Sequence, residues 1–437
     1  MTTSYEEGLQ FLNSLPFRDV KPGLKRVNFM LDYLGNPQSN FRSVHVGGSN
    51  GKGSVSALIS SALGGRYRTG TFVSPPLMGF RDRIWINGNK ISRTSVGKLV
   101  ERLKQPVMEL KRDGDTPTLF EAATVLCSLY FAEEGIDIAI LESGLGGRYD
   151  ATTDIGDPLL TVITNIEEEH VDLLGPTRED IAWEIAGLVQ DSSPTVAGDI
   201  TSPELEILEK ECEKKDSILH MAPQQFEVDL LDFDWDRARY RVRSLNPDWF
   251  REDTLKLGLL GEFQGLNLQT TYSALDILQH RNYPLSAEEV KKGLEKTRWP
   301  GRLQVVGKEP YVILDGAHNP SACAVLSEEL EKYRLLTEPE NKVRVVISAL
   351  EDKNFSSMVE ALTAVTDVFI ITCLSHPRAR DLDSMEEIVQ HRNIPYLKAG
   401  EPHGAFRLAL ENSEIGDIIC VTGSLYLVRE AISRGIG

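Results

Sequence analysis

The sequence predicts an α/β protein of two domains, because strands and helices alternate along most of the chain and this alternation is interrupted once. Short apolar runs alternate with longer helical periods from residue 43 to about residue 300, which is typical of a parallel sheet covered on both faces. Trp299-Pro300-Gly301 interrupts the pattern, and the alternation then restarts. We therefore predict a mostly parallel sheet domain over residues 1–297 and a smaller open α/β domain over residues 298–437.

The elements of the first domain follow from its apolar runs. Its predicted strands are 43–46, 71–73, 136–141 and 159–163, and its predicted helices are 52–63, 119–133 and 178–189. Residues 199–260 differ, because a charged helix is followed by polar alternation, which predicts a small antiparallel β region at one edge of the sheet. A further helix begins near Gln264, and Ser286 with Glu289 forms a capping box for the helix that ends near Lys296.

The second domain shows the same alternation on a smaller scale. Its predicted strands are 311–314, 343–347, 368–371 and 418–421. Asn319-Pro320 is typical of a helix start, with asparagine as N-cap and proline at the first helical position.

Charge and composition exclude several classes of partner. The 437 residues carry 47 Lys and Arg against 65 Asp and Glu, a net charge of −18, so the protein as a whole repels nucleic acid and anionic membranes. No apolar run approaches the ~20 residues of a membrane span, and the N-terminus lacks the basic and apolar segments of a signal peptide. The five cysteines include no CxxC pair, which predicts a reduced, cytoplasmic protein without disulfides or a zinc site.

The strongest indication of chemistry is the segment SVHVGGSNGKGSV, residues 43–55, in which a strand runs into a glycine-rich loop and then a helix. Backbone N–H groups of such a loop converge on a phosphate, and the helix N-terminus adds partial positive charge. Lys52 would neutralise the β- and γ-phosphates of a nucleotide, and Ser54 has the hydroxyl needed near Mg²⁺. The predicted phosphate-binding residues are Gly48, Ser49, Asn50, Gly51, Lys52, Gly53 and Ser54.

This loop departs from the strict Walker A spacing, because Val46 stands where the first glycine belongs and Gly53 follows the lysine. The alternative interpretation is a glycine-rich turn with a solvated lysine. We favour nucleotide binding, because strand, loop, lysine, hydroxyl and helix occur in the required order.

Nine further segments extend the resemblance to a known family. The loop GGSNGKGS resembles that of the Mur ligase superfamily, and the further segments narrow the resemblance to its folylpolyglutamate synthase/dihydrofolate synthase branch. They occur in the same order as in the family and span almost the whole chain. The segments are YLGNPQ (33–38), FVSPPL (72–77), RDRI (81–84), TLFEAAT (118–124), LESGLGGRYDAT (141–152), GEFQGLN (261–267), WPGRLQ (299–304), LDGAHNP (314–320) and TGSLYLV (422–428).

The resemblance implies a P-loop-type ATP-binding domain followed by a Rossmann-like ligase domain that binds an amino acid. It implies ATP and Mg²⁺ as cofactors, and a dihydropteroate or folate with glutamate as substrates. ATP would phosphorylate the acid, and the α-amino group of glutamate would attack the acyl phosphate to form an amide. Fixed cations would stabilise both steps, so no protein nucleophile is required. We expect a monomer with no nucleic acid or membrane partner.

The predicted metal site combines position with resemblance. Glu142 ends a predicted strand beside a glycine turn, where α/β sheets place their ligands. By resemblance, Ser74, Glu142 and His170 are Mg²⁺ ligands, to which the loop adds Ser54. The predicted catalytic residues are Lys52, Glu142 and His170. The alternatives are a turn-capping carboxylate for Glu142 and a surface histidine at a helix start for His170.

Further contacts are implied by the resemblance in the second half of the chain. Asn267 is expected at the base of ATP and Arg302 at a phosphate. Asp315 and His318 are expected at the ribose and at the base or a phosphate, although Asp315 could instead cap the following turn. Ser424, at a predicted helix start, could bind the carboxylate of the incoming amino acid or serve only as an N-cap.

Two residues of the first domain are assigned to the acid substrate. Arg83 lies in the RDRI segment and Phe120 in the TLFEAAT segment. Phe120 and Phe72 could both stack on a pterin ring, but core packing explains each of them as well.

Three positions depart from the family pattern. Ile185 replaces the carbamoylated lysine that the family uses for a second Mg²⁺, and isoleucine offers no ligand atom. We hypothesise that Glu169 or Glu168 assists that ion, the alternative being a solvated helix entry. Pro76 replaces a histidine beside Ser74, and Arg429 replaces a glycine.

The leading hypothesis is therefore an ATP- and Mg²⁺-dependent ligase that adds glutamate to a dihydropteroate or folate. Alternatives are the same chemistry on another acid–amine pair, a nucleotide-binding homologue that has lost catalysis, and a kinase that stops at phosphoryl transfer. We also expect a hinge near residues 296–300, at which Gly301→Pro would impair turnover more than ATP affinity.

Overall fold

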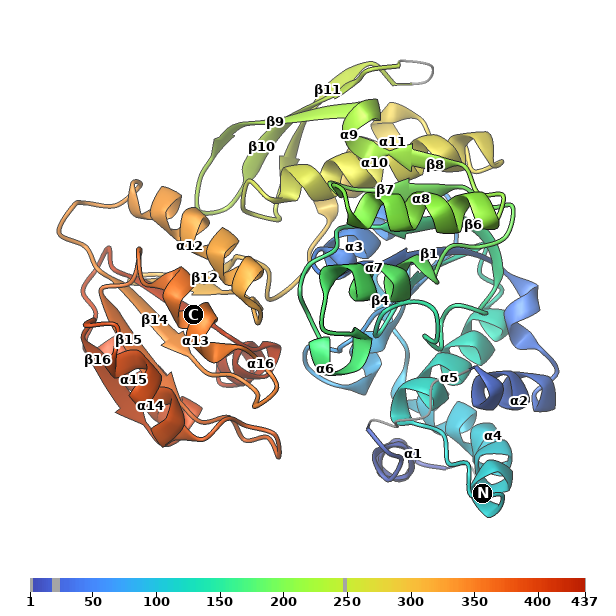
Figure 1. The fold of residues 1–437 in the computed structure, drawn as a ribbon, viewed down its shortest axis with the longest axis horizontal. Helices are drawn as coiled ribbons and strands as arrows, with labels where there is room; N and C mark the ends of the chain where they lie inside the picture. Colours follow the sequence, from blue (N-terminus) through green and yellow to red (C-terminus); the bar gives the residue numbers. More distant parts are fainter. Residues whose placement is uncertain (1–2, 18–23, 247–249, 437) are drawn as a thin grey trace. The chain divides into compact units, whose positions relative to one another are not determined.

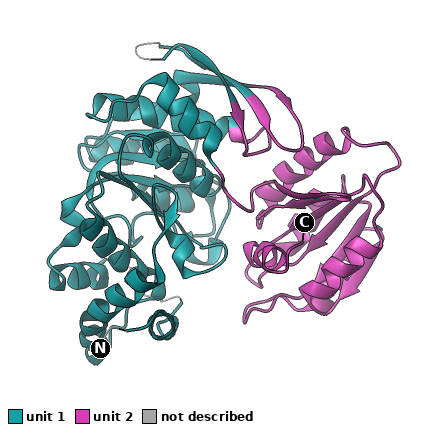
Figure 2. Cartoon of the chain, turned by 180° about the vertical axis from the view of Figure 1, so that it is seen from behind, with its two compact units in different colours: residues 1–229, 240–255, 265–297 teal, residues 230–239, 256–264, 298–437 magenta. Residues whose placement is uncertain are grey.

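The computed structural model describes residues 3–17, 24–246 and 250–436, which form two compact units (Figures 1 and 2). The first unit comprises residues 1–229, 240–255 and 265–297, and the second comprises residues 230–239, 256–264 and 298–437. The last division of the chain lies between residues 297 and 298. This is where the sequence pattern predicted a domain boundary. Two short segments that the sequence analysis assigned to the first domain group with the second unit.

The first unit is built on an eight-stranded sheet with the order β4-β3-β2-β5-β1-β6-β7-β8. Its strands are β1 (Arg42–Gly47), β2 (Thr69–Phe72), β3 (Ile84–Ile86), β4 (Asn89–Lys90), β5 (Ile138–Glu142), β6 (Asp157–Ile163), β7 (Thr195–Ala197) and β8 (Leu219–Met221). The six strands β2, β5, β1, β6, β7 and β8 are neighbours in this order and all pair in parallel. At one edge, β3 pairs antiparallel with β2, and β4 pairs antiparallel with β3. The carboxyl ends of the parallel strands therefore meet at one edge of the sheet.

Helices cover this sheet on both faces (Figure 1). They are α1 (Tyr5–Asn13), α2 (Lys25–Tyr33), α3 (Lys52–Leu63), α4 (Arg93–Arg112), α5 (Leu119–Glu134), α6 (Val171–Leu174), α7 (Arg178–Ala186), α8 (Glu204–Lys214), α9 (Ala222–Gln225), α10 (Gln264–His280) and α11 (Ala287–Lys296). The predicted capping box of Ser286 and Glu289 is confirmed at the start of α11. Helix α7 is shorter than predicted, because Gly187 caps it after Ala186.

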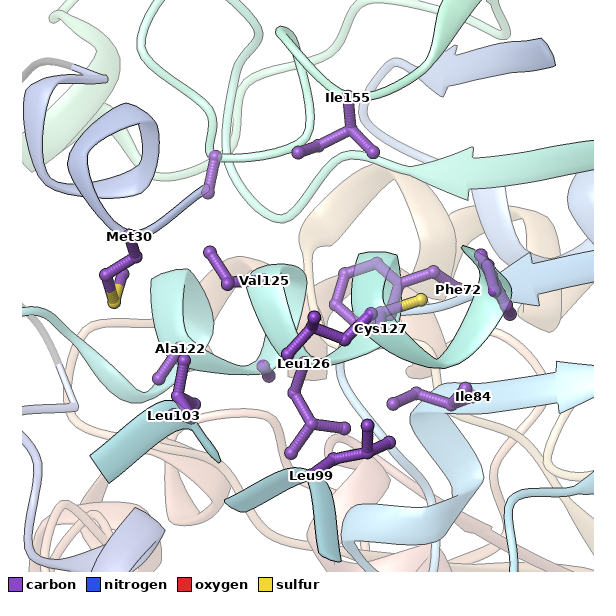
Figure 3. Packing of buried hydrophobic residues seen from close by; sticks show 14 of the residues in the cluster. Met30, Phe72, Ile84, Leu99, Leu103, Ala122, Val125, Leu126, Cys127 and Ile155 are labelled. Carbon is purple, nitrogen blue, oxygen red and sulfur yellow. The ribbon is translucent and has the colours of Figure 1, made fainter. Parts of the chain in front are cut away.

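Helix α5 lies inside the core of the first unit rather than on its surface (Figure 3). Its residues Val125 and Leu126 are buried with Phe72 of β2 and Ile84 of β3. Each large apolar side chain buried in this way stabilises the fold by about 1.5–3 kcal/mol. The position of α5 also fixes the residues at its N-terminus.

A buried ion pair secures the start of α5. Arg26 of α2 donates from Nε to Glu121 Oε1 at 3.0 Å and from Nη1 to Asp115 Oδ1 at 3.1 Å. Glu121 also completes a capping box with Thr118. These contacts hold the segment that leads into Phe120, a predicted substrate residue.

The polar alternation in residues 199–260 forms a separate three-stranded sheet with the order β11-β10-β9, rather than strands added to the main sheet. Its strands are β9 (Phe226–Phe233), β10 (Ala238–Ser244) and β11 (Glu252–Leu257). The arginines of β10 face outward and pair across to β9, as in the pair between Arg241 Nη2 and Asp229 Oδ2 at 2.7 Å. Alternate residues such as Tyr240 and Val242 are buried.

The tip of the β9–β10 hairpin belongs to the second unit (Figure 2). The Trp235 ring stacks on the Tyr311 ring with centroids 3.6 Å apart, and Tyr333 packs against Trp235 at 5.0 Å. Lys308 Nζ donates to Asp236 Oδ2 at 2.8 Å. A stretch of chain from inside the first domain therefore completes the apolar surface of the second unit.

The chain consequently passes between the units after residues 229, 239, 255, 264 and 297, not only at the hinge expected near residues 296–300. Gly301 is also engaged inside the second unit, because its N–H donates to Gln304 Oε1 at 3.0 Å and its carbonyl accepts from Gly316 N at 2.9 Å. Gly301→Pro would remove the first of these bonds. It is therefore not a selective test of a hinge.

The second unit contains a six-stranded sheet with the order β12-β13-β17-β14-β15-β16, parallel except for β12. Its strands are β12 (Gln304–Lys308), β13 (Tyr311–Leu314), β14 (Val343–Ile347), β15 (Val368–Thr372), β16 (Tyr396–Ala399) and β17 (Ile418–Thr422), and its helices are α12 (Pro320–Arg334), α13 (Phe355–Leu362), α14 (Leu382–Gln390), α15 (Pro402–Glu411) and α16 (Leu425–Ser433). The predicted N-cap Asn319 is confirmed, because its side chain accepts from Ala322 N at 2.8 Å.

The expected α/β architecture is confirmed in both units. Short strands such as β7, β8 and β16 were not predicted, because they contain too few residues to give a periodic pattern. In the part of the chain that the structure describes, no helix combines the length and the apolar composition needed to cross a membrane.

Candidate active site

The glycine-rich loop lies between β1 and α3 and is held by the residues that follow the neighbouring strand β6. Ser49 N donates to Asn165 O at 3.0 Å, and Asn50 N donates to Asn165 Oδ1 at 2.8 Å. Thr164 Oγ1 donates to Asn50 O at 2.6 Å. The loop backbone is thus fixed by the fold itself. Thr164 and Asn165 were not predicted, although a polar pair directly after a buried strand could have indicated them.

Gly48 is required at its position by both conformation and space. Its φ is +124°, and a Cβ there would lie 2.9 Å from Asn165 O and closer still to Thr164 Oγ1. A larger residue would displace the two residues that hold the loop. The glycine spacing of the motif therefore follows from this packing.

The start of helix α3 is suited to an anion. Its N-cap is Gly51, which has no side chain to accept a hydrogen bond from the first turn. The first N–H groups of a helix have no partner within the helix and carry partial positive charge. A phosphate is the ligand that this arrangement favours.

Lys52 lies over the loop that it follows. Its Nζ donates to Gly48 O at 2.6 Å and to Ser49 O at 2.8 Å. These carbonyls keep the ammonium beside the loop, where its charge can reach a phosphate bound by the loop N–H groups. The role of Lys52 at the phosphates of a nucleotide stays a prediction.

Asn267 is brought to the same loop from more than two hundred residues away in the sequence. It is buried on α10, and a Cβ at Gly51 would lie 2.5 Å from its Oδ1. Ser54 is buried in the first turn of α3. The structure therefore groups two predicted nucleotide-binding residues with the loop, while the contact of Asn267 with a base stays a prediction.

Glu142, Ser74 and Arg83 form a second cluster at the same sheet edge. Glu142 ends β5, level with Val46 of β1, and its Oε2 accepts from Ser74 N at 3.1 Å. Arg83 Nη1 donates to Ser74 Oγ at 3.1 Å. A carboxylate, a hydroxyl and a guanidinium are thus placed together one strand away from the phosphate loop.

Asp150 shapes the glycine turn that follows Glu142. Its buried Oδ2 accepts from Gly144 N at 2.8 Å and from Leu145 N at 2.9 Å, and its Oδ1 accepts from Thr152 N at 3.0 Å. Burial raises the pKa of Asp150, and these hydrogen bonds oppose the rise. Asp150 was not predicted as a site residue, because most of its partners are backbone groups, which have no recognisable spacing in the sequence.

Phe120 packs on this glycine turn. A Cβ at Gly144 would lie 2.6 Å from Phe120 Cζ, and the Phe120 and Phe72 rings are 5.8 Å apart. Phe72 is fully buried, so the core-packing interpretation is correct for it. Phe120 is only partly buried, and its role beside the acid substrate stays a prediction.

The acidic run that precedes His170 is joined to the phosphate loop. Glu167 N donates to Ser49 Oγ at 2.9 Å, which ties the run to the loop. His170 is the N-cap of α6, and its Nε2 lies 3.5 Å from Glu169 Oε1. Glu169 is buried whereas Glu168 is exposed. Of the two carboxylates proposed for a second ion, Glu169 is therefore the one placed beside a predicted metal ligand.

Ile185 lies in an apolar environment. It is 2% exposed and belongs to a cluster with Ile163, Ile181 and Leu188. The structure gives this position a packing role in the first unit. Arg429, the third departure, is exposed on α16, and nothing in the structure explains that substitution.

In the second unit, Asp315 organises the turn after β13. Its Oδ2 accepts from Leu303 N at 2.7 Å and its Oδ1 accepts from Ala317 N at 2.8 Å. Burial raises its pKa, and the Arg302 guanidinium opposes the rise. The turn-capping interpretation thus describes the observed contacts of Asp315, and its contact with a ribose stays a prediction.

Arg302, His318 and Ser424 are placed at the same sheet edge of the second unit. Arg302 Nη1 donates to Gly301 O at 3.1 Å, and His318 Nδ1 lies 2.8 Å from Gly316 O. Ser424 is the buried N-cap of α16, where its Oγ accepts from Tyr426 N at 3.2 Å. The simple capping role of Ser424 is therefore present, and any contact with an amino acid would add to it.

The predicted metal ligands suit an ion that is held mainly by its substrates. Across residues 3–17, 24–246 and 250–436, no three or more His, Cys, Asp or Glu side chains form a group able to hold a metal. The predicted set instead combines the Ser54 and Ser74 hydroxyls with Glu142 and His170. Mg²⁺ takes one or two protein groups and completes its coordination with phosphates and water, so the donors of Glu142 and the serines fit such an ion.

Both units match domains of one class of ligase. Residues 46–274 match the Mur ligase middle domain, and residues 301–425 match the Mur ligase, glutamate ligase domain. Fold and site therefore define an ATP-dependent ligase that forms an amide bond.

More specific likenesses follow from full-length relatives. The chain is 34% identical to the dihydrofolate synthase/folylpolyglutamate synthase of Bacillus subtilis (strain 168), with 99% of this chain and 100% of that protein covered. The chain belongs to the dihydrofolate synthase/folylpolyglutamate synthase family, and the predicted resemblance is confirmed.

Two solved structures support the same conclusion. E. coli FolC in complex with DHPP and ADP is 25% identical and superposes with a TM-score of 0.86, covering 99% of this chain and 97% of that chain. The bifunctional folylpolyglutamate synthase/dihydrofolate synthase of Yersinia pestis, complexed with AMPPNP and Mn ion, is 26% identical with a TM-score of 0.83, covering 99% and 98%.

Proposed function

We propose that this protein joins L-glutamate to a dihydropteroate or a folate through an acyl phosphate, with ATP and Mg²⁺ as cofactors, in the cytoplasm. The observation that carries the proposal is the prebuilt phosphate loop with Lys52 above it, in a chain that belongs to this family. The free cysteines among the described residues agree with a reducing compartment.

The first unit would carry the phosphoryl transfer. The loop N–H groups and Lys52 hold the triphosphate, and the carboxylate of the acid attacks the γ-phosphorus, which releases ADP and leaves an acyl phosphate. Arg83 and Phe120 are assigned to the acid, because they flank Ser74 and the glycine turn after Glu142. An arginine beside the acid would orient its carboxylate.

Ser54, Ser74, Glu142 and His170 would hold Mg²⁺, which when bound supplies positive charge for the phosphoryl and acyl transfers. Glu169, 3.5 Å from His170 Nε2, orients that ring and adds negative charge near the site. Because Ile185 is packed in an apolar cluster, we assign no ligand role to that position.

The second unit would bind the rest of the nucleotide and the amino acid. Arg302, Asp315 and His318 are assigned to ATP, with Asn267 of the first unit at the base. Ser424 at the start of α16 is assigned to a carboxylate of glutamate. The amine then attacks the carbonyl carbon of the acyl phosphate, the bond to phosphate breaks, and the amine loses a proton as the amide forms.

A second candidate is the same reaction on a different acid. Pro76, in the segment next to Ser74, has a side chain that cannot donate a hydrogen bond, so recognition of the acid differs there from the family pattern. Recognition of the acid, rather than ATP chemistry, is where this chain would diverge.

The test is amine-dependent ADP release by the purified chain, with mass spectrometry of the product. We expect turnover with glutamate and dihydropteroate or a folate, and a product enlarged by one glutamyl residue. Turnover only with other acids would support the second candidate. ATP binding without amine-dependent turnover would refute both.

A further inference from the structure

Three loops meet at the carboxyl edge of the sheet in the second unit. Residues 348–354 follow β14, residues 373–381 follow β15, and Gly423 with Ser424 leads from β17 into α16. Because β14 lies between β15 and β17, the loop after β14 lies between the other two loops. This edge is where open α/β sheets bind their ligands.

Arg380 joins two of these loops. Its Nη2 donates to Glu351 O at 2.9 Å and to Lys353 O at 2.7 Å, and its backbone N–H donates to Ala349 O at 3.0 Å. This last bond and the one from Glu351 N to Arg378 O, also 3.0 Å long, form an isolated antiparallel bridge between Leu350 and Ala379. One guanidinium thus satisfies two carbonyls of a loop that has no regular structure of its own.

The loop that Arg380 fixes lies directly against the start of α16. Ser348 O approaches Gly423 so closely that a Cβ on this glycine, whose φ is +91°, would collide with it. The β15 loop also contacts α16, because the His376 and Tyr426 rings lie 4.4 Å apart and Ser375 N lies 3.4 Å from Glu430 Oε1. A shift of either loop would therefore move the surroundings of Ser424.

We propose that Arg380 is a positioning residue for the incoming amino acid. It acts through Glu351 and Lys353, whose carbonyls it holds, and so keeps the β14 loop against Gly423 and Ser424. This inference rests on the proposed function, which assigns Ser424 to a carboxylate of glutamate. Arg380 would act without touching the substrate or the nucleotide.

The chemistry of arginine explains why this residue type is suited to the position. Both carbonyls accept from Nη2, whose two N–H groups have fixed directions in the plane of the guanidinium, whereas the ammonium of lysine turns on a flexible stem. Holding two carbonyls at a set separation is therefore a task for arginine. Arg380→Lys should restore part of the function that Arg380→Ala loses.

The experiment compares steady-state kinetics of the full-length wild type with those of Arg380→Ala and Arg380→Lys, varying glutamate and ATP separately. We expect Arg380→Ala to raise KM for glutamate by about tenfold, because small misplacements of a binding group cost large factors in rate. KM for ATP should change by less than about twofold, since Arg380 lies outside the predicted ATP contacts. Added guanidinium ion should lower the raised KM for glutamate.

Arg392→Ala is the matched control in the same unit. Arg392 Nη2 also donates to a backbone carbonyl, Ser356 O at 3.4 Å, and to Ser356 Oγ at 3.1 Å, but on α13. We expect it to lower the melting temperature without changing KM for glutamate. If Arg380→Ala and Arg392→Ala give the same pattern, Arg380 is merely structural and the inference is wrong.

Other outcomes separate this inference from the function on which it rests. An unchanged KM for glutamate in Arg380→Ala, or equal increases for glutamate and ATP, would overturn the inference alone. If Arg380→Ala does not fold, Arg380→Lys gives the same comparison. A wild type with no glutamate-dependent turnover would instead refute the proposed function.

Discussion

The phosphate loop of the first unit and the strand-end loops of the second unit occupy the same kind of position but are stabilised differently. The phosphate loop is held by backbone and short side-chain bonds from Thr164 and Asn165, and a Cβ on Gly48 would collide with both of these residues. In the second unit, long or charged side chains bind backbone groups, as Asp315 does for Leu303 and Ala317 and as Arg380 does for Glu351 and Lys353.

This difference predicts that the two regions tolerate amino-acid substitutions to different degrees. Where the backbone itself is the ligand-binding group, almost every substitution changes the site. Where side chains position loops, the backbone can follow a substitution in part. Changes in the first region should therefore abolish activity, whereas changes in the second should shift individual substrate constants.

Lys52→Ala should have the largest effect. Removal of the only side-chain charge of the loop deprives the transferring phosphoryl group of its fixed cation, and we expect a loss of about 10³-fold in kcat/KM. Steady-state amide formation is the measurement, with Lys98→Ala on the exposed face of α4 as the control for charge. Undiminished amide formation in Lys52→Ala would remove the basis of the proposed mechanism.

Gly48→Ala should come next, and it tests whether the loop is as constrained as its packing indicates. The added Cβ would displace Thr164 and Asn165, and we expect kcat/KM for ATP to fall by about 10²-fold. Gly114→Ala is the matched control, since Gly114 also has a positive φ, +75°, but nothing within 4 Å of its Cβ position.

Both substitutions place a side chain at a positive φ, which costs on the order of 1–3 kcal/mol. The difference between them therefore reports mainly the steric contact with the residues after β6. If the two variants lose the same ATP affinity, the loop tolerates a side chain and the contrast with the second unit fails.

His45 should make the first unit the more acid-sensitive of the two. It is fully buried in β1, and burial lowers its pKa from 6.5 to about 4, whereas the strands of the second unit contain no histidine. The unfolded chain then binds a proton between pH 6.5 and 4 that the folded chain does not. The free energy of unfolding is therefore not reduced by His45 above pH 6.5. As the pH drops below 6.5, protonation of His45 in the unfolded chain lowers this free energy, by about 3 kcal/mol at pH 4.

Thermal or urea unfolding at pH 7 and at pH 4–5 measures this effect. Because other groups titrate in the same range, the informative quantity is the difference between the wild type and His45→Gln. The variant should lose less stability on acidification. An identical pH dependence of both proteins would show that His45 does not govern the acid sensitivity of the first unit.

Glu169→Gln should give the smallest of these effects. We expect it to raise the Mg²⁺ concentration for half-maximal rate by roughly tenfold or less, because groups that adjoin metal ligands tune affinity rather than create it. Glu168→Gln, at the exposed neighbour, should leave that concentration unchanged. Equal Mg²⁺ dependence of wild type and Glu169→Gln would leave the buried carboxylate without a role at the metal.

The contrast between the two regions also explains what the sequence could predict. The phosphate loop was recognisable because its requirements are local, namely glycines, a lysine and a hydroxyl at fixed spacing between a strand and a helix. The α/β alternation was recognisable for the same reason, since buried strands and helices have characteristic periods.

Contacts between distant residues could not be predicted in this way. Asn165 meets Asn50 across 115 residues, and Arg380 meets Glu351 across 29. In each case the side chain binds a backbone group, which every residue possesses, so no pair of residue types marks the contact in the sequence. The hairpin of β9 and β10 was recognised as a β region for its alternation, but the destination of its tip depends on Tyr311 and Tyr333.

That hairpin tip has a consequence for how the protein could have been assembled by recombination. A gene fragment that starts at residue 298 would encode the Tyr311 and Tyr333 rings without Trp235, which stacks on the first and packs against the second. A fragment that ends at residue 297 would retain Trp235 without them. The two halves of the chain are therefore not independent modules. A recombination event that replaced the second unit would also have had to replace the turn that contains Trp235.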